Sequence, residues 1–345
     1  MGVLQETCDA IHSRNKEIEQ HIIKNWNDAS DSKQYGRLVD MVAQYGAATN
    51  QENVTIPKPC MIIASADHGV ADMGVSAYPK ETTVGMTQNY LIPKGAGANS
   101  LANYCGATME VIDMGIDADM SWVPGLRSHK LGMGTKNFVE EPAMTREQAI
   151  EGIETGIKLV QEKMADGYNV FLVGEMGISN TTASALMTAM FAGLTAEEAT
   201  GRGTNISDER LKLKQRIVHD VLVKYQDIPK DDAIGILAAV GGFEFTCIVG
   251  VILGAAAHHG MVIIDGFNTS ACALVAKTLV PASMDYVMAS HLSAEKAAKS
   301  SLQNLGLEAY VDLGLCLGEA SGGSVQMGML DLAVYMYKSV IGGKA

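Results

Sequence analysis

Six short runs of apolar residues, each of a length typical of a buried strand, recur along the chain after residue 59. They span residues 60–66, 109–114, 168–173, 233–240, 261–264 and 309–315. Between most of them lie segments rich in Ala, Met, Leu and Glu, residue types that favour helices. Alternating strands and helices predict right-handed strand–helix–strand units, so we predict an α/β protein with a mainly parallel sheet.

The two ends of the chain show another pattern, in which apolar residues recur at helical spacing among charged ones. This pattern covers residues 1–48 and 327–340, and we predict that both ends form helices of one small cap. The longest apolar run, at residues 245–257, fits a core helix and is too short to span a bilayer. Residues 118–147 are rich in Gly, Pro and polar groups, and a loop of that length is usually functional.

A carboxylate and a glycine stand near the end of every predicted strand. The sequences are Asp67-His-Gly, Asp113-Met-Gly, Gly174-Glu-Met-Gly, Gly241-Gly-Phe-Glu, Asp265-Gly-Phe-Asn and Gly318-Glu-Ala-Ser-Gly-Gly. Ligands of open α/β sheets bind outside the carboxyl ends of the strands, so these ends outline the predicted site. The alternative for any single end is that Asp and Gly are ordinary turn residues.

Length and charge limit the classes of function. A chain of 345 residues with 47% hydrophobic and 19% charged residues can bury a large core, in about two domains. The formal net charge of -13, spread without a basic block, argues against nucleic acid or an anionic membrane as a partner. A local basic pocket for one phosphate remains compatible with that charge.

Cysteine, histidine and glycine motifs give no sign of a cofactor. The six cysteines form no CxxC pair and mostly lie in apolar runs, so we predict structural thiols in a reducing compartment, the cytoplasm. His68 and the pair His258-His259 lack the spacing of metal ligands, so we predict no metal. Residues 95–100 imitate half of a dinucleotide fingerprint, but they follow Pro-Lys rather than a strand, and no P-loop exists.

The most informative segment is residues 170–185, a buried strand that breaks at glycines into a helix beginning beside Ser179 and Asn180. The first N–H groups of a helix and the positive end of its dipole favour an anion, so this turn predicts a phosphate site, with Glu175 at the strand's edge. Lys214 would reach such a phosphate as a point charge. Its alternative is a lysine on a solvated helix face.

Two carboxylates are candidates for acid–base chemistry. Glu319 lies where a predicted strand passes into a helix of small residues, and partial desolvation there suits a general base. The alternative for Glu319 is a capping residue in the first turn of that helix. The alternative for Glu175 is a structural acceptor for backbone N–H groups.

Together these motifs resemble those of one family over nearly the whole chain, the nicotinate-nucleotide:dimethylbenzimidazole phosphoribosyltransferases, which make the lower-ligand nucleotide of cobamides. The landmarks are Asp67-His-Gly-Val, Gly74-Val-Ser-Ala-Tyr-Pro-Lys, Asp113-Met-Gly-Ile-Asp, Gly134-Thr-Lys-Asn, Pro142-Ala-Met-Thr, Gly174-Glu-Met-Gly-Ile-Ser-Asn-Thr-Thr, Gly241-Gly-Phe, Asp265-Gly-Phe, Ser290-His-Leu-Ser-Ala-Glu-Lys and Leu317-Gly-Glu.

The resemblance implies a reaction in which nicotinate mononucleotide loses nicotinate and its ribose C1 joins an aromatic base, with inversion to the α configuration. Glu319 aligns with the catalytic base of the family and Glu175 with a second active-site carboxylate. No metal or redox cofactor is implied. The implied phosphate and ribose site consists of Gly177, Ile178, Ser179, Asn180, Lys214, Asp265, Ser293 and Gly318.

The implied fold is a Rossmann-like domain, residues 56–320, whose mainly parallel sheet carries helices on both faces. A small helical domain would combine residues 1–50 and 321–345. The implied assembly has two subunits with sites near their interface. Whether this chain pairs with itself or with a paralogous subunit is left open.

The implied acceptor pocket holds Ser76, Tyr78 and Met86. Relatives that use benzimidazole typically have Ser and Gln where this chain has Tyr78 and Met86. A phenol has one polar atom, at its nucleophilic end, so the rest of its pocket should be apolar. The chain therefore resembles the phenol- and p-cresol-activating branch, specifically the catalytic subunit of its heterodimeric enzyme, which forms an O-glycosidic bond. The alternatives are N-ribosylation of 5,6-dimethylbenzimidazole, a non-catalytic partner subunit and a nucleotide-binding oxidoreductase.

Overall fold

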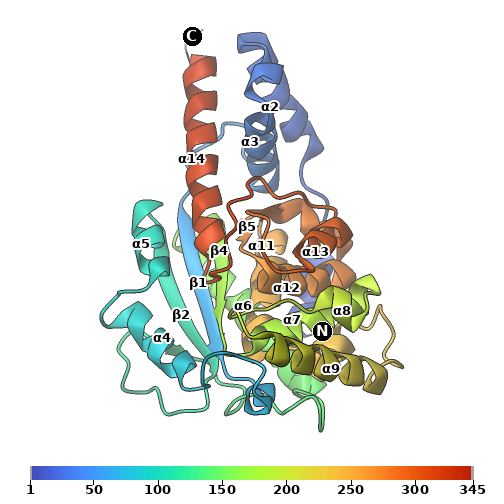
Figure 1. Cartoon of the computed structure of the whole chain (residues 1–345). Coiled ribbons are helices and arrows are strands. Elements are labelled where there is room, and N and C mark those ends of the chain that lie inside the picture. Colours follow the sequence, from blue (N-terminus) through green and yellow to red (C-terminus); the bar gives the residue numbers. More distant parts are fainter. Residues whose placement is uncertain (1, 343–345) are drawn as a thin grey trace.

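The computed structural model describes residues 2–342 and is built around a sheet of six parallel strands (Figure 1). The strands are β1 (Pro59–Ala66), β2 (Thr108–Gly115), β3 (Arg127–Ser128), β4 (Val170–Met176), β5 (Met261–Ile264) and β6 (Val287–Ala289). Their order in space is β3-β2-β1-β4-β5-β6. The chain thus builds one half outward from β1 and the other outward from β4, which leaves a crevice at their carboxyl ends. The predicted α/β class is confirmed.

The central strands are buried and mostly apolar. All eight residues of β1 and all four of β5 are buried. Parallel strands that carry helices on both faces read as continuous apolar runs, because neither face meets water. Ile62 of β1 lies opposite Glu110 of β2 and Val173 of β4.

Helices cover both faces of this sheet (Figure 1). On one face α11 and α12 contact β4 and β5, with α6 packed behind α11; α4, α5 and α14 contact strands on the other. The helices are α1 (Val3–Ala10), α2 (Lys16–Ala29), α3 (Arg37–Ala48), α4 (Thr82–Leu91), α5 (Gly97–Tyr104), α6 (Arg146–Ala165), α7 (Asn180–Ala192), α8 (Ala196–Ala199), α9 (Asp208–Lys224), α10 (Ala233–Val240), α11 (Phe243–Ala257), α12 (Phe267–Leu279), α13 (Ala298–Leu305) and α14 (Ser321–Gly342).

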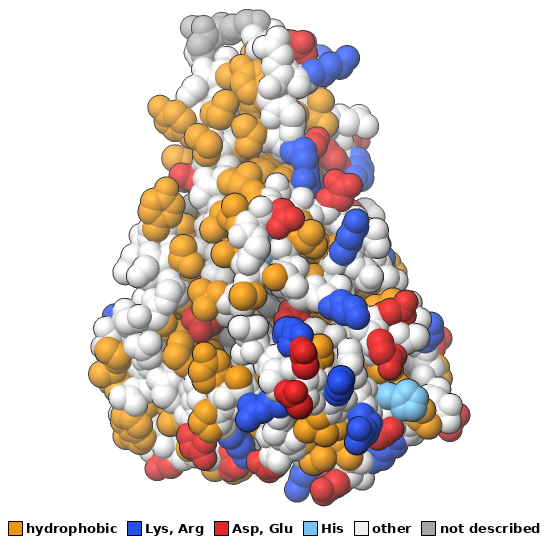
Figure 2. Space-filling view, viewed as in Figure 1, with side chains coloured by type: hydrophobic (Ala, Val, Ile, Leu, Met, Phe, Trp, Pro, Cys, Tyr) orange, Lys and Arg blue, Asp and Glu red, His pale blue; other side chains and the backbone are white. Residues whose placement is uncertain are grey.

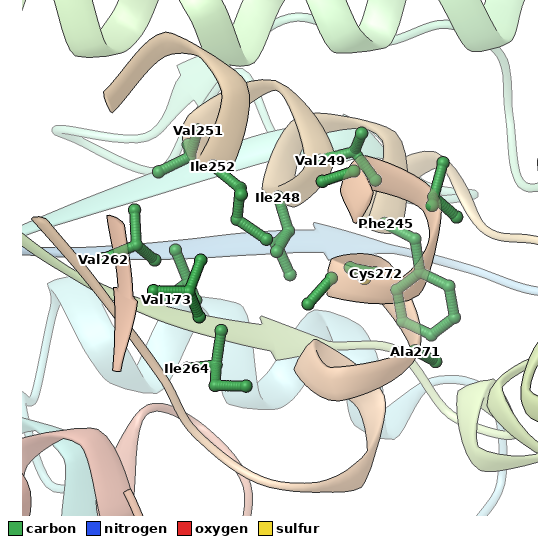
Figure 3. Packing of buried hydrophobic residues seen from close by; sticks show 14 of the residues in the cluster. Val173, Phe245, Ile248, Val249, Val251, Ile252, Val262, Ile264, Ala271 and Cys272 are labelled. Atoms are coloured by element: carbon green, nitrogen blue, oxygen red, sulfur yellow. The ribbon is translucent and has the colours of Figure 1, made fainter. Parts of the chain in front are cut away.

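The core is centred on α11, which confirms a core helix for the apolar run at residues 245–257. Figure 3 shows its side chains, Ile248 among them, directed at the sheet. Helix α6 crosses α11 so closely that a Cβ on Gly156 would stand 2.1 Å from the carbonyl oxygen of Cys247, a contact that glycine alone permits. No helix within residues 2–342 has both the length and the apolar composition needed to cross a membrane.

Helices from both ends of the chain pack together beyond one end of the sheet (Figure 1). The buried ring of Trp26 in α2 lies 5.3 Å, centroid to centroid, from Tyr337 in α14. The predicted terminal helices are confirmed, although α14 also contacts β4, β5 and α5. The domain boundaries at residues 50 and 320 stay predictions. Met1 and residues 343–345, which the predicted helical domain includes, lie outside the described residues.

The strand predicted at residues 233–240 is wrong, because this run forms α10. All eight side chains of α10 are buried, and a short run that is apolar on every side has no periodicity to separate strand from helix. The signal for a helix stands just before the run. The side chain of Asp232 caps the helix by accepting from the Gly235 N–H at 3.0 Å.

The strand predicted at residues 309–315 is also wrong, since the segment forms only an isolated bridge between Val311 and His291. It nevertheless runs beside the chain that follows β6, where the Leu292 N–H donates to the Val311 carbonyl at 2.9 Å. A further bond of 3.1 Å joins the Ala294 N–H to the Leu315 carbonyl. These contacts position the residues after 315 at the carboxyl edge of the sheet.

Candidate active site

A cavity of about 550 Å³ opens at the carboxyl ends of β4 and β5. Its walls come from parts of the chain that are far apart in sequence, which the parallel topology brings to one edge. The lining residues belong to the segments 78–86, 175–181, 203–205, 265–268, 291–295 and 316–319.

Most of the predicted site residues line this cavity. They are Tyr78, Met86, Glu175, Gly177, Ile178, Asn180, Asp265, Ser293, Gly318 and Glu319. Ser179 and Lys214 do not line it but are buried beside lining residues. Ser76 also lies outside the lining, and its hydroxyl is 3.2 Å from that of Thr204, which is part of the wall.

Not every predicted strand end contributes to the cavity. Asp67 and Asp113, near the ends of β1 and β2, instead accept backbone N–H groups at and after the end of β2, the first from Asp117 at 2.8 Å and the second from Gly115 at 3.0 Å. For these two ends the turn-residue alternative is correct. The loop at residues 118–147 contributes no residue to the cavity wall, so a functional role for it stays a prediction.

The turn between β4 and α7 has the geometry of an anion site. Ser179 adopts a left-handed conformation with φ of 78°, and its buried hydroxyl has no hydrogen-bond partner among the described residues. Gly177 packs so tightly that a Cβ would lie 2.6 Å from the Ala66 carbonyl oxygen. The Ile178 N–H donates to the Thr83 hydroxyl at 3.2 Å, which fixes the turn against α4. A free hydroxyl at the start of a helix suits an anionic ligand.

Lys214 is 1% exposed, so the solvated-face alternative is wrong. It shares the inward face of α9 with Ile217, and its Nζ donates to the Thr181 hydroxyl at 2.9 Å. Burial lowers the pKa of Lys214 to about 8, against the opposing charge of Glu295. The Glu295 carboxylate also accepts from the Gly203 N–H at 2.7 Å. A buried cation thus stands directly behind the turn.

Glu175 is held by a chain of side-chain amides. Its carboxylate accepts from the Asn180 side chain, whose oxygen accepts from Asn268 at 3.0 Å. Asn268 in turn accepts from the Ser184 hydroxyl at 2.7 Å. Burial raises the pKa of Glu175 to about 8, although the bonds from the two asparagines lower it. The Glu175 carboxyl group therefore holds its proton at neutral pH.

Glu319 stands on a turn of three left-handed residues, with φ of 79° at Gly318, 59° at Glu319 and 58° at Ala320. This turn packs against Gly174 of β4, where a Cβ would lie 2.6 Å from the Ala320 nitrogen. The side chain is 6% exposed, and Oε2 has no hydrogen-bond partner among the described residues. Burial raises the pKa of Glu319, and the hydroxyl of Tyr90 opposes that rise. A desolvated carboxylate of this kind is suited to accept a proton.

Asp265, rather than Glu319, caps the helix that follows. Its Oδ1 accepts from the backbone N–H groups of Gly322 at 2.6 Å and Gly323 at 3.1 Å, in the first turn of α14. Glu319 precedes the first residue of α14, so its capping alternative is wrong. Burial raises the pKa of Asp265 to about 6. Asp265 therefore has a structural role at the site, and its predicted contact with the ribose stays a prediction.

One wall of the cavity comes from the chain leading into α4. Tyr78, Thr82 and Met86 lie on this wall, and the last two share one face of α4 at a spacing of four residues. Tyr78 is 57% exposed and Met86 is half-buried. This wall carries aromatic and thioether surface and the hydroxyl groups of Tyr78 and Thr82, with no carboxamide side chain.

His291 is a cavity residue for which no sequence pattern predicted a role, although it stands in the motif at residues 290–296. Its Nδ1 lies 3.1 Å from the Ser290 hydroxyl, which donates to the Asp265 carbonyl at 2.6 Å. Because the hydrogen of that hydroxyl is already donated to the carbonyl in a hydrogen bond, the hydroxyl can only accept from His291. Nδ1 therefore carries the ring hydrogen, and Nε2 is left as an acceptor. Burial lowers the pKa of His291 and favours this neutral form.

Cys316 also lines the cavity and is exposed, so the prediction of a structural thiol is wrong for this cysteine. Cys60, Cys247 and Cys272 are buried. The sequence signal for the exposure of Cys316 was its position after residue 315, outside any apolar helix.

The histidines considered as metal ligands have other contacts. The Nε2 of His68 lies 2.6 Å from a Glu244 carboxylate oxygen in the interior, and His258 contacts Gln161. Within residues 2–342, no three His, Cys, Asp or Glu side chains gather closely enough to hold a metal ion.

Fold and cavity define a class. A doubly wound sheet whose switch-point crevice combines an anion turn, a buried lysine and desolvated carboxyl groups suits group transfer from a phosphorylated substrate. A family model described as "Phosphoribosyltransferase" matches residues 11–342, and the chain belongs to this family.

Relatives named nicotinate-nucleotide–dimethylbenzimidazole phosphoribosyltransferase are similar over most of their length. The protein of Geobacter metallireducens is 42% identical over 305 residues, which are 88% of this chain and 86% of that protein. The protein of Chloroflexus aggregans is 42% identical over 298 residues, 86% and 84% of the two chains. The crystal structure of CobT from Thermus thermophilus superposes with a TM-score of 0.88 at 32% identity, and covers 93% of this chain and 96% of that one.

Proposed function

We propose that this protein transfers the phosphoribosyl group of nicotinate mononucleotide to a small aromatic acceptor and that the acceptor is a phenol such as phenol or p-cresol. The first part rests on the family, the names of the relatives and the contents of the cavity. The second part rests on one observation, the aromatic and thioether surface of Tyr78 and Met86 on a wall without a carboxamide side chain. The product would be an α-O-glycosidic ribotide for assembly of a cobamide lower ligand.

In the proposed reaction the acceptor oxygen forms a bond to ribose C1 while the bond from C1 to the pyridinium nitrogen breaks. The electron pair of that bond leaves with nicotinate, and the phenolic proton passes to Glu319. A phenol has a pKa of about 10, so at neutral pH its attack needs such a base. Glu175 lines the same cavity, and the phosphate at the Gly177–Asn180 turn holds the ribose in place.

The acceptor wall is what favours a phenol over a benzimidazole. A benzimidazole carries a second ring nitrogen, and a pocket that selects it profits from a polar partner there. The wall at residues 78–86 offers thioether and aromatic surface in place of a carboxamide. A phenol, whose single polar atom points to Glu319, needs no carboxamide partner on that wall.

The names of the relatives favour the second candidate acceptor, 5,6-dimethylbenzimidazole. A competition assay separates the two: the protein is incubated with nicotinate mononucleotide and an equimolar mixture of phenol, p-cresol and dimethylbenzimidazole, and the products are identified by mass spectrometry. Phenolic ribotides as the main products support the proposal. Exclusive formation of the benzimidazole ribotide would contradict the phenolic acceptor but leave the phosphoribosyl transfer intact.

The same assay addresses the remaining alternatives. A non-catalytic partner subunit would form no product alone, and a nucleotide-binding oxidoreductase would copurify with a cofactor visible by its absorbance. The presence of both Glu319 and Glu175 in one cavity argues against a non-catalytic subunit.

We also propose that the protein works as a pair of subunits, with a second copy or a paralogous chain. Exposed apolar side chains gather over α5 and α14 and continue to the cavity mouth (Figure 2): Tyr104 is 85% exposed, Leu332 52%, Tyr335 66% and Leu317 54%. A contiguous apolar surface of this kind marks an interface. Light scattering after size exclusion tests it, because a Leu332→Lys and Tyr335→Lys double variant should shift a wild-type dimer to monomer. A wild-type protein that is monomeric alone and dimeric only with a co-expressed paralogue would assign the heterodimer.

A further inference from the structure

Tyr90 lies behind the acceptor wall and next to the candidate base. Helix α4 places Thr82, Met86 and Tyr90 on one face at spacings of four residues, and the first two line the cavity. Tyr90 is 1% exposed, and its hydroxyl interacts with the carboxyl group of Glu319. That hydroxyl makes no hydrogen bond of standard geometry to any described residue.

The carboxyl groups at this edge of the sheet differ in what holds them. Glu175 accepts from Asn180, and Asp265 accepts from the N–H groups at the start of α14. Glu319 stands on a turn of left-handed residues, and its Oε2 is buried without a partner among the described residues. One unpaired donor, the Tyr90 hydroxyl, and one unpaired acceptor therefore stand side by side. Hydrogen bonds of this kind are often long in an empty active site and shorten when the substrate is bound.

We propose that Tyr90 is a positioning residue whose hydroxyl donates to Glu319 Oε2 and so turns Oε1 of the base toward the acceptor hydroxyl. The proposal rests on the proposed function, in which Glu319 takes the acceptor's proton. Because Tyr90 and Met86 belong to the same face of α4, an acceptor that packs against Met86 also presses on the helix that carries Tyr90. Filling of the acceptor pocket and alignment of the base are then mechanically linked.

The bond has an electrostatic consequence. Tyr90 from α4 and Asp265 after β5 act on Glu319, and two further titratable groups, Glu175 from β4 and the neutral His291 after β6, line the same cavity. Burial and the Asp265 carboxylate raise the pKa of Glu319, whereas donation from Tyr90 stabilises the charged form and lowers it. Loss of the hydroxyl should therefore raise the pKa of the base.

The test compares Tyr90→Phe, which removes only the hydroxyl, with Tyr337→Phe as a matched control. Tyr337 is also 1% exposed, but its hydroxyl contacts Asn25 in the terminal helices, far from the cavity. We expect kcat of Tyr90→Phe to fall by roughly tenfold or more, the loss expected for a hydrogen bond to a charged group. The acidic limb of its pH–rate profile should move up by about one unit, while the Kd for nicotinate mononucleotide stays the same.

A direct titration of Glu319 makes the test independent of the acceptor. Carbon NMR of protein labelled at the glutamate carboxyls, with Glu319→Gln to assign the signal, gives the pKa of Glu319 in the wild type and in Tyr90→Phe. A higher pKa in Tyr90→Phe supports the proposal, and an unchanged pKa overturns it, as does a loss of kcat that Tyr337→Phe shares. Absence of any product from the wild type would instead contradict the proposed function, and the NMR comparison would still decide the role of Tyr90.

Discussion

The individual side chains at the cavity owe their chemistry to burial more than to contact with opposite charges. Glu175, Glu319 and Asp265 all have raised pKa values, and burial is the largest cause for each. Lys214 shows the same effect with the opposite sign. Desolvation disfavours the charged form of each group, so the carboxyl groups bind protons more readily and the lysine loses its proton more readily. An anionic substrate would supply the negative charge that stabilises the charged form of Lys214.

The role of Glu319 leads to a residue-scale prediction. Glu319→Gln keeps the shape of the side chain but removes the proton acceptor, so turnover should fall by roughly 10²–10⁴ while nicotinate mononucleotide still binds. Steady-state kinetics together with calorimetric binding would show this split. Turnover close to that of the wild type would remove Glu319 from the chemistry.

Lys214 gives a second prediction, on the recognition of phosphate. Lys214→Ala should weaken binding of nicotinate mononucleotide far more than binding of nicotinate riboside, which lacks the phosphate, because the turn loses its buried cation. The measured quantity is the ratio of the two dissociation constants. Lys212→Ala, two residues away on an exposed position of the same helix, is the control and should change neither. Equal losses for both ligands would move the phosphate elsewhere.

The sequence predicted which residues line the cavity better than it predicted their burial and their contacts. The strand-to-helix turn at Gly177 and the carboxylates Glu175 and Glu319 follow from local patterns, because strand ends and helix starts are local. The burial of Lys214 depends on how α9 packs, although its spacing from Ile217 and Val221 was a usable helical signal. Tyr90 reads as an ordinary core aromatic, and no pattern along the chain relates it to a glutamate more than two hundred residues away.

At the scale of elements, the limits of prediction follow from length. The apolar runs that became β1, β2, β4 and β5 were recognisable because they are bounded by turn residues. Strands β3 and β6 have two and three residues, too few to carry a period. Helix α10 is buried on every side, so only its cap at Asp232 distinguishes it from a strand. Elements that depend on their neighbours for their form are the ones that a sequence pattern misses.

The contact between β4 and the turn before α14 yields an element-scale prediction. Gly174→Ala would put a Cβ within 2.6 Å of the Ala320 nitrogen, so the turn that carries Glu319 must shift. A shift of about 1 Å can cost a factor of about 10² in rate, so we expect a large fall in kcat in protein that remains folded by circular dichroism. Gly85→Ala, in α4, is the matched control, since nothing lies within 4 Å of the added Cβ. Equal kcat values for the two variants would show that the turn tolerates displacement.

At the scale of the whole molecule, the strand order explains why the site lies where it does. The two halves of the sheet diverge at β1 and β4, and the cavity is lined by residues that follow each of these strands, 78–86 after β1 and 175–181 at the end of β4. Asp67 and Asp113 do not line the cavity and instead accept backbone N–H groups at and after the end of β2. Burial raises the pKa values of Glu175 and Asp265 at this cavity, so their titration should be visible in the stability of the whole chain.

The last prediction is therefore the pH dependence of unfolding. The pKa of Glu175 is about 8 in the folded protein, whereas an unperturbed glutamate has a pKa of about 4.3. Between those values the folded protein binds a proton that the unfolded chain has released, so the free energy of unfolding should decrease as pH rises from about 5 to 8. Asp265, with a pKa of about 6, adds a smaller decrease of the same sign.

Glu175→Gln removes the titrating group while its side-chain oxygen can still accept from Asn180. The variant should lose most of this slope and, at pH 8, be more stable than the wild type by an amount on the order of a few kcal/mol. Urea unfolding at half-unit intervals of pH measures both curves. Glu308→Gln, at an exposed position, should follow the wild type. Parallel curves for Glu175→Gln and the wild type would mean that Glu175 ionises normally in the folded protein. Burial would then not raise the pKa of Glu175.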